Sequence, residues 1–450
     1  MKKLFVLAIA GLLVNRVSSQ EHHHEATDTT KPHKQEMPEM HMEHDDSLHN
    51  MPLMSHAYSL NLPMSRNGSG TSWLPDNSPM YMYFGGNAKS SWAIHGAMFF
   101  RYNNQDVFNK SSRGANKFDA PNWFMGMYNR RVGSRGLFNA TAMISLDPLT
   151  IGQNGYPLLF QTGETYNGEP LVDRQHPHDL ISGLSVAYTH MLNEDADVTV
   201  YAGYPGEPAL GPVAFMHRIS ALNNPNAPLG HHWQDATHIV YGVATLGIRY
   251  KKIELEGSIF NGREPDEDRY RFDKGRFDSY SYRVSYNPSQ HWALQFSQGF
   301  LHEPEVLEPG IDQVRTTASI IRSTSLRTLN WSHTLAWGMN DKTNHDHHEY
   351  SILYETNVQF IRQALYARYE FVKKSAEELA ILTTHGDDLF NIHAFTLGYN
   401  HNISPAAPVD LLLGFQATLN FPGDRLKPVY GTLPVGAQVY LQLRPRRHQH

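Results

Sequence analysis

The residues with the most marked chemical character are the histidines and methionines of residues 21–56. Imidazole nitrogen binds Cu(II), Zn(II) and Ni(II), whereas the methionine thioether is a soft ligand that selects Cu(I). The tract is polar and aperiodic, so its methionines have no core to fill. We interpret it as a metal-binding segment, with a solvated low-complexity leader as the alternative. The candidate ligands are His22, His23, His24, His33, Met37, Met40, His41, Met42, His44, His49, Met51, Met54 and His56.

A second group of histidines lies in two long links between predicted strands. One link contains Asp173-Arg-Gln-His-Pro-His-Asp179, and the other runs from 205 to 238 and contains Gly230-His-His-Trp-Gln-Asp235. A loop of this length without secondary structure of its own is usually functional or disordered. The longer link could fold into a barrel lumen as a constriction. The candidate ligands are His176, His178, His217, His231, His232 and His238.

Two interpretations of these loop histidines remain open. In the first, His176 and His178 are ligands at i and i+2, and His231 or His232, together with Asp235 and His238, completes the site. In the second, the histidines form hydrogen bonds with loop backbone at the mouth of a barrel. Spacing alone favours the second interpretation.

The elements that must position these residues are strands. In Val435 to Leu443 every second residue is apolar, and the same period of two occurs in Leu411 to Asn420 and in His291 to Phe300. That period indicates strands with one apolar and one polar face. We predict about sixteen strands (14–18), near 92–102, 123–130, 137–146, 180–192, 197–204, 239–250, 252–261, 279–288, 291–301, 313–323, 326–338, 348–359, 362–373, 389–401, 408–420 and 435–444.

The connections between these strands favour a membrane barrel over a soluble sandwich. Tight turns, such as Tyr250–Lys252 and Ser323–Ser325, alternate with long links such as 147–179 and 205–238. Short periplasmic turns and long extracellular loops are typical of outer-membrane barrels. We therefore predict an all-β, antiparallel transmembrane β-barrel, and its even strand count places both termini in the periplasm.

Charged residues on the predicted strands are expected to face the lumen. Glu254 and Glu256 alternate with apolar residues, as do Arg368 and Glu370. A Lys or Arg facing lipid at mid-membrane would cost about 2–4 kcal/mol. The charges favour a pore or ligand-lined channel and interior salt bridges about equally.

Three regions follow from the composition along the chain. Lys2 and Lys3 precede an apolar run to Val14, which indicates a signal peptide over 1–20. Residues 21–67 are predicted to be a disordered periplasmic leader, and 73–450 the barrel. The chain has no cysteine and a net charge of −6 without a basic segment, so we expect no nucleic-acid partner.

Five segments of the chain are distinctive: Gly70-Thr-Ser-Trp-Leu-Pro-Asp76, Asp173-Arg-Gln-His-Pro-His-Asp-Leu180, Gly211-Pro-Val-Ala-Phe215, Gly230-His-His-Trp-Gln-Asp235 and Ser258-Ile-Phe-Asn-Gly-Arg-Glu-Pro-Asp266. They resemble segments of uncharacterised bacterial outer-membrane barrel proteins that often accompany heavy-metal, especially copper, efflux systems. The leader is also similar to that of the copper resistance protein B family. The first resemblance implies the outer membrane and a metal context, with efflux components as partners, and it implies no catalytic residue.

The leading functional hypothesis is a non-enzymatic outer-membrane barrel that binds or passes transition-metal ions. Copper or a related ion is its ligand, no cofactor is essential, membrane lipid surrounds it, and a homo-trimer is expected by analogy with other sixteen-stranded barrels. The alternative is a general porin for small solutes with an incidental leader. The third hypothesis is an outer-membrane hydrolase using His333 with Ser332 or Ser323, although adjacent residues on a strand point to opposite faces.

Overall fold

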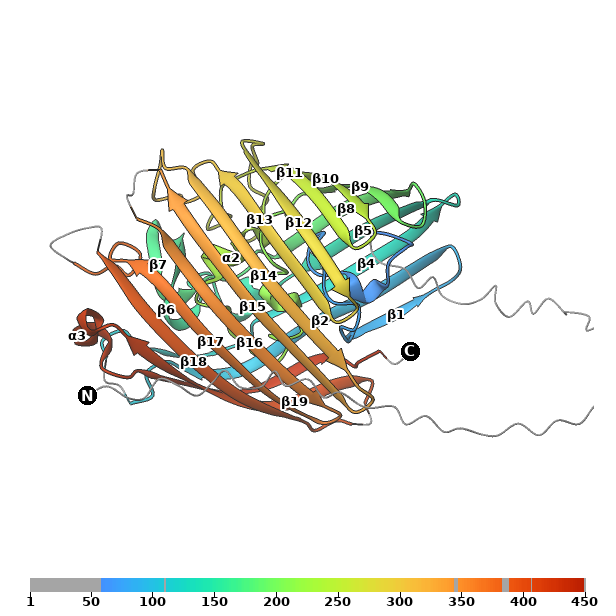
Figure 1. Cartoon of the computed structure of the whole chain (residues 1–450). Coiled ribbons are helices and arrows are strands. Elements are labelled where there is room, and N and C mark those ends of the chain that lie inside the picture. Colours follow the sequence, from blue (N-terminus) through green and yellow to red (C-terminus); the bar gives the residue numbers. More distant parts are fainter. Residues whose placement is uncertain (1–57, 109–110, 344–346, 383–387, 406, 449–450) are drawn as a thin grey trace, which may run out of the picture. The chain divides into compact units, whose positions relative to one another are not determined.

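In the computed structural model, sixteen antiparallel strands of the described residues close into a barrel. Figure 1 shows the barrel from the side. The structure describes residues 58–108, 111–343, 347–382, 388–405 and 407–448. Each strand pairs with its neighbour in the chain, and β2 closes the circuit by pairing with both β4 and β20. The barrel strands are β2 (Ser90–Asn104), β4 (Asn122–Val132), β5 (Gly136–Ile144), β8 (Ile181–Met191), β9 (Ala196–Gly203), β10 (Val243–Tyr250), β11 (Ile253–Phe260), β12 (Ser279–Ser289), β13 (Trp292–Leu301), β14 (Gln313–Ser325), β15 (Leu329–Lys342), β16 (Glu349–Phe360), β17 (Gln363–Ser375), β18 (Leu389–Asn402), β19 (Val409–Pro422) and β20 (Val435–Pro445).

The predicted fold class is confirmed, and each predicted strand corresponds to one strand of the barrel. The largest boundary errors are at β10, where residues 239–242 belong to the preceding link, and at β15, which was predicted at 326–338. The turn predicted at Ser323–Ser325 lies inside β14, and the chain turns instead at 326–328. Serine and threonine at the end of β14 resemble turn residues in sequence, which accounts for this error.

Four strands and several short helices were not predicted. β1 (Met82–Gly86) and β3 (Asn116–Asp119) extend the pairing of β2, and β6 (Tyr156–Tyr166) and β7 (Glu169–Gln175) form a separate hairpin. Among the residues that the structure describes, no helix has the length and apolar character needed to cross a membrane. The helices are η2 (Met64–Arg66), α1 (Asp147–Thr150), η3 (Phe215–His217), α2 (His231–Gln234), η4 (Ala236–His238), η5 (Asp424–Leu426) and α3 (Lys427–Tyr430).

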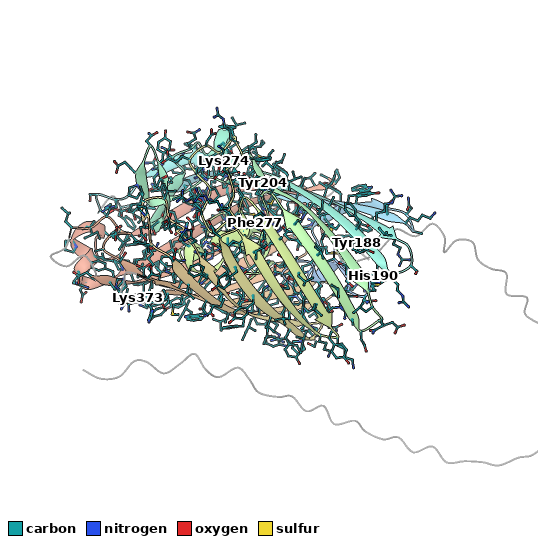
Figure 2. The ribbon with its side chains drawn as sticks, turned by 90° about the horizontal axis from the view of Figure 1, so that it is seen from above. Tyr188, His190, Tyr204, Lys274, Phe277 and Lys373 are labelled. Atoms are coloured by element: carbon teal, nitrogen blue, oxygen red, sulfur yellow. The ribbon has the colours of Figure 1, made fainter. Side chains whose placement is uncertain are left out.

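The alternation along each strand places apolar side chains outside and polar side chains inside the barrel. In β11, Ile253, Leu255 and Ile259 are at least half exposed, whereas Glu254 and Glu256 are buried. Tyr188 of β8 is one of the outward-facing aromatic side chains (Figure 2). An antiparallel barrel with an even strand number, an apolar outer face and a polar interior has the architecture of outer-membrane barrels.

The two ends of the barrel differ in the length of their connections. At one end β10 and β11 are joined by only residues 251–252, whereas at the other β9 and β10 are joined by 204–242. β2 begins and β20 ends at the end with the short turns. On the outer-membrane plan this is the periplasmic end, and the long links are extracellular.

Three segments fill the barrel interior. Residues 58–80 contact the strands near the short turns, where Ser59 donates a hydrogen bond to Asp197 (2.7 Å). The β6–β7 hairpin packs near the long links, where Lys374 donates to Thr162 (2.6 Å). Residues 205–242 are buried almost throughout, so the expectation that this link folds into the lumen is confirmed.

Residues 58–67, in the first of these segments, are ordered, so the predicted boundary between the leader and the folded part of the chain is wrong. The leader was predicted to be disordered up to Asn67, yet residues 58–67 include η2, and Met64 and Arg66 are buried. The Arg66 guanidinium forms two hydrogen bonds of 2.6 Å with Asp76 and lies over the ring of Trp73. These contacts, which hydropathy does not reveal, fold the segment onto itself. The predicted signal peptide and residues 21–57 lie outside the described residues.

Charged residues of the strands hold the filling segment 205–242 in place. Arg218 donates from Nε to Glu355 Oε2 (3.0 Å) and from its terminal nitrogen to Asp235 Oδ2 (2.8 Å), and Arg368 pairs with Glu355 (2.7 Å). All four side chains are at most 2% exposed. Glu256 pairs with Arg283 (2.8 Å) in the same way. Of the two alternatives for the charged lumen, interior salt bridges therefore account for Glu256 and Arg368.

Candidate metal centre

The filled interior brings together five of the predicted histidines. His176 and His178 lie between β7 and β8, His231 and His232 are in α2, and His238 is in η4. The ring centroids of His231 lie 5.2 Å from those of both His232 and His238, and His176 lies 5.5 Å from His232. His178 lies 5.5 Å from His238. We call these five residues the histidine cluster.

Each imidazole of the histidine cluster is fixed through its Nδ1 atom. His231 contacts Asp235 Oδ1 at 2.6 Å, and His178 contacts Asp147 Oδ2 at 2.8 Å. His176 contacts Glu164 at 3.0 Å, and His232 contacts Glu264 at 3.1 Å. His238 contacts the backbone oxygen of Asp235 at 2.8 Å. Because carboxylate and backbone oxygens accept hydrogen bonds, these contacts favour the tautomer with the proton on Nδ1.

The other ring nitrogen is buried without a partner in every member of the cluster. Among the described residues, none forms a hydrogen bond with Nε2 of His176, His178, His231, His232 or His238. With Nδ1 protonated, each Nε2 presents a free lone pair. Buried polar atoms in proteins normally have partners, and metal-bound histidines normally donate their second nitrogen to a carboxylate or carbonyl. The cluster has both features of a metal site: Nε2 atoms without a partner among the described residues, and Nδ1 atoms held by carboxylate or carbonyl oxygens.

Three of these imidazoles converge closely enough to bind one ion. One ring nitrogen each of His176, His231 and His232 lies within 4.8 Å of the others, and all three residues are buried. Nitrogens bound to one zinc ion lie about 3.4 Å apart, given Zn–N distances of about 2.1 Å and tetrahedral angles. Small side-chain movements would therefore bring the three nitrogens into coordination. His178 and His238 flank this group.

Burial favours the neutral form of His176, His231, His232 and His238, because it lowers the pKa of each imidazole. It lowers the pKa of His176 and of His238 well below the usual value, and neighbouring histidines lower both further. Burial also lowers the pKa of His231, even though Asp235 acts in the opposite direction. A neutral imidazole is the form that binds a metal ion. The carboxylates around the cluster would supply the negative charge that a divalent ion requires.

A cavity of about 140 Å³ adjoins the cluster on the side of the long links. His232, Glu264 and Glu305 form a second group whose potential ligand atoms lie within 4.8 Å of one another. Burial raises the pKa of Glu264 to about 7 and that of Glu305 to about 8. A cation that enters this cavity would displace the protons of Glu264 and Glu305. The two carboxylates could then bind the cation next to His232.

The helix that carries His231 and His232 rests on the barrel wall. Gln234 donates to Ser351 Oγ (3.0 Å), and Asn340 donates to the backbone oxygen of His232 (3.1 Å). The ammonium group of Lys374 lies 4.7 Å from the centre of the Trp233 ring. A Cβ atom on Gly338 of β15 would lie only 2.1 Å from the Trp233 backbone oxygen. The glycine therefore permits α2 to approach the wall.

Gly338→Ala is expected to weaken metal binding although Gly338 is not a ligand. The added methyl group must displace the Trp233 carbonyl and with it His231 and His232, which precede Trp233 in α2. We expect metal affinity to fall about 10-fold or more, as when the support of a metal ligand is lost. The measurement is competition with a chelator on the folded protein. Gly126→Ala is the control, since no atom lies within 4 Å of its added Cβ. Equal affinities of the two variants would contradict the role of Gly338.

The remaining predicted ligands do not belong to the histidine cluster. His217 lies outside the histidine cluster, 5.7 Å from His95 between ring centroids. Asp235 was expected as a ligand, but both of its carboxylate oxygens are occupied by His231 and Arg218, so it positions His231. The leader candidates fall outside the described residues: His22, His23, His24, His33, Met37, Met40, His41, Met42, His44, His49, Met51, Met54 and His56.

Sequence reasoning missed the carboxylates and one histidine of this region. Asp147 and Glu164 lie in the same link as His176 and His178 but at least 12 residues before them, and Glu264 lies in the link between β11 and β12, so no short motif connects these carboxylates with the histidines. His95 lies on β2 among apolar residues. The odd-numbered residues of β2 face the lumen, and His95 is one of them. A histidine on the lumen-facing side of a predicted strand could therefore have been proposed as a candidate from the sequence.

The residues of the hydrolase hypothesis lie on opposite faces of β15. Ser332 is buried in the interior and contacts Ser323 Oγ at 3.0 Å. His333 is on the outer face, where its Nδ1 contacts the Tyr354 hydroxyl at 2.9 Å. The structure does not bring either serine to this histidine.

No family model matches this sequence, and the search of curated proteins finds no match. Among solved structures, the chain is similar to an anion-selective porin from Comamonas acidovorans, with a TM-score of 0.45, 11% identity, and coverage of 79% of this chain and 100% of the porin. It is similar to Salmonella typhi OmpF in complex with daunomycin (TM-score 0.47, 8% identity, 79% and 98% covered). It is also similar to the outer membrane protein opdK from Pseudomonas aeruginosa (TM-score 0.40, 7% identity, 78% and 98% covered). At these identities the similarity concerns the barrel fold alone. It does not extend to the solutes that these proteins pass or bind.

Proposed function

We propose that this chain is an outer-membrane barrel that binds a transition-metal ion inside its lumen, with His176, His231 and His232 as ligands. One observation carries the proposal: five buried imidazoles have Nδ1 fixed by an acceptor and Nε2 without a partner among the described residues. Leaving so many buried lone pairs unsatisfied is costly in an apoprotein, and a bound ion removes that cost.

The donor set narrows the identity of the ion. Imidazole suits Zn(II), Cu(II) and Ni(II), while Ca(II) and Mg(II) prefer oxygen ligands. We propose copper as the biological ion because the leader combines histidine with methionine, a pattern that suits both oxidation states of copper. The leader would then capture ions on the periplasmic side of the same protein.

A general porin for small solutes is the second candidate function. The closed barrel and its charged interior provide the frame that such a channel requires. The interior, however, is occupied by residues 58–80, the β6–β7 hairpin and residues 205–242, and cavities between the described residues there have volumes of about 140, 70 and 50 Å³. A porin would show steady conductance that does not respond to copper or to removal of the leader.

Metal retention by the purified, folded full-length protein tests the proposal. After loading with Zn(II) or Cu(II) and washing with a weak chelator, His176→Ala/His231→Ala is expected to retain one equivalent less than the wild type. His333→Ala is the matched control, because that histidine lies on the outer face of the barrel and outside the cluster. Equal retention by the double variant and the control would refute the metal centre and favour the porin.

Membrane lipid is the partner that the apolar outer face requires. We extend the proposal to two further partners: periplasmic efflux components, which would receive ions from the leader, and two further copies of the chain in a trimer. Cross-linking in intact outer membranes would detect both assemblies.

A further inference from the structure

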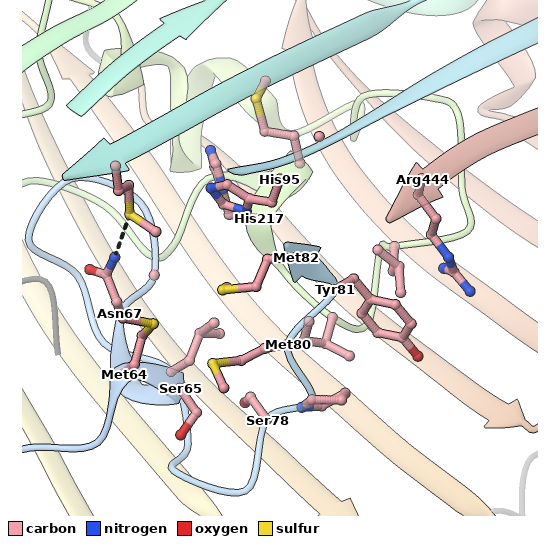
Figure 3. A pocket seen from close by; sticks show the side chains of 18 of the residues that line it. Met64, Ser65, Asn67, Ser78, Met80, Tyr81, Met82, His95, His217 and Arg444 are labelled. Atoms are coloured by element: carbon pink, nitrogen blue, oxygen red, sulfur yellow. Dashed lines mark hydrogen bonds between the residues drawn. The ribbon is translucent and has the colours of Figure 1, made fainter. Parts of the chain in front are cut away.

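A second cavity, of about 70 Å³, lies inside the barrel near the end with the short turns. Its lining comes from residues 64–82, β2, β4 and the segment around η3. Five methionines line it: Met64, Met80, Met82, Met127 and Met216. In Figure 3, Met64, Met80 and Met82 gather on one side of the cavity, with His95 and His217 on the other. We call this space the methionine cavity.

The two imidazoles of the methionine cavity are held by an aromatic wall. The rings of His95 and His217 lie 5.1 and 4.6 Å from the ring of Trp123, measured between centroids. Nε2 of His95 is buried and has no hydrogen-bond partner among the described residues. It is therefore an unsatisfied nitrogen that adjoins a space lined by thioethers.

Methionine commonly fills irregular gaps in a core, which is the ordinary explanation for such a group. Here the methionines do not close the gap, because the remaining cavity has room for an ion or for water. The methionines also come from parts of the chain that are distant in sequence. One of them is oriented by a polar contact: Asn67 Nδ2 donates to the sulfur of Met127 at 3.5 Å. Gap filling explains neither the remaining space nor the unsatisfied imidazole.

The charge around the methionine cavity selects the kind of ion. The described residues that line it include no Asp or Glu, and its one charged residue, Arg444, is 3.7 Å from Asp410. A hard divalent cation would find neither oxygen anions nor charge compensation there. Thioether sulfur and neutral imidazole instead form a soft, uncharged donor set, which favours Cu(I).

We propose that the methionine cavity binds a soft monovalent cation, Cu(I) or its analogue Ag(I), through thioethers of Met64, Met80 and Met82 and the imidazole of His95. This site is separate from the histidine cluster and does not depend on it. η3 lies between the two sites: Met216 lines the methionine cavity and also a cavity that His176 and His178 line. The lumen would thus have a carboxylate-supported histidine site on the side of the long links and a soft site near the short turns.

Silver binding by the full-length folded protein tests this site. Met64→Leu/Met80→Leu/Met82→Leu nearly conserves side-chain volume but removes the sulfur ligands. We expect it to retain one Ag(I) equivalent less than Met143→Leu, a matched control for a buried methionine that lies outside this cavity. The leader is identical in both variants, so its silver cancels in the comparison. Equal retention by the two folded variants would overturn the proposal.

Two further arms keep the result interpretable. His176→Ala/His231→Ala is expected to lose its Zn(II) equivalent but keep this Ag(I) equivalent, so the two sites can fail separately. If the triple variant does not fold, methyl-labelled methionine in the wild-type protein gives the answer by NMR. Ag(I) should then shift the methyl resonances of Met64, Met80 and Met82 and leave that of Met143 in place. Unchanged resonances of the first three would overturn the proposal.

Discussion

Glu355→Ala is expected to destabilise the folded barrel by about 3–5 kcal/mol, the usual cost of breaking a buried ion pair by removing one partner. Glu355 of β16 accepts from both Arg218 and Arg368, and all three side chains are at most 2% exposed. Its loss leaves Arg368 without its carboxylate and Arg218 with Asp235 alone. Because Arg218 belongs to the segment 205–242, the variant should also loosen the filling of the lumen.

Urea unfolding and planar-bilayer recording measure these two effects separately. We expect a lower unfolding midpoint and conductance above that of the wild type. Asp424→Ala is the control, since Asp424 pairs with Lys427 at 2.5 Å but is 91% exposed. Loss of such a surface pair should leave the stability nearly unchanged, because solvent screens the two charges. An unfolding midpoint for Glu355→Ala equal to that of the control would contradict the structural role of the buried network.

Asp235→Ala is expected to lower the metal affinity of the histidine cluster by about 10–100-fold, as is typical when the support of a metal ligand is removed. Asp235 holds Nδ1 of His231 at 2.6 Å and pairs with Arg218 at 2.8 Å. Burial alone would raise the pKa of Asp235, but His231 and Arg218 together hold it below the usual value. The residue therefore remains an anion that keeps the His231 proton on Nδ1.

Chelator competition with Zn(II) measures the affinity change. Asp147→Ala is the comparison variant, because Asp147 holds His178, which flanks the three converging imidazoles. We expect a smaller loss for Asp147→Ala than for Asp235→Ala. The opposite order would show that the ion is bound around His178 and His238.

The strands were predictable because a membrane barrel repeats one simple pattern. In β11 exposed and buried residues alternate along the whole strand, in β20 every second residue from Val435 to Leu443 is apolar, and each strand pairs with its neighbour in the chain. The segment 58–67 and the β6–β7 hairpin lack this signal, because they pack inside the barrel and their polar residues are satisfied by distant partners. Ser59 with Asp197 is one example.

The metal centre was predictable in part. Histidines of the two long links could be proposed as ligands, and the length of 205–238 suggested that it enters the lumen. Spacing alone could not show that α2 would bring His231 and His232 to His176, because the position of α2 depends on contacts with β15 such as that at Gly338. For the same reason the methionine cavity could not be foreseen, since Met64 and Met216 meet only through the fold.

Anomalous diffraction from crystals of the full-length protein equilibrated with Zn(II), recorded on both sides of the zinc edge, tests the central claim most directly. We predict a zinc peak inside the barrel, bonded to Nε2 of His176, His231 and His232 at about 2.0–2.1 Å. A barrel interior without zinc at these nitrogens, in crystals whose protein retains zinc by elemental analysis, would contradict the claim.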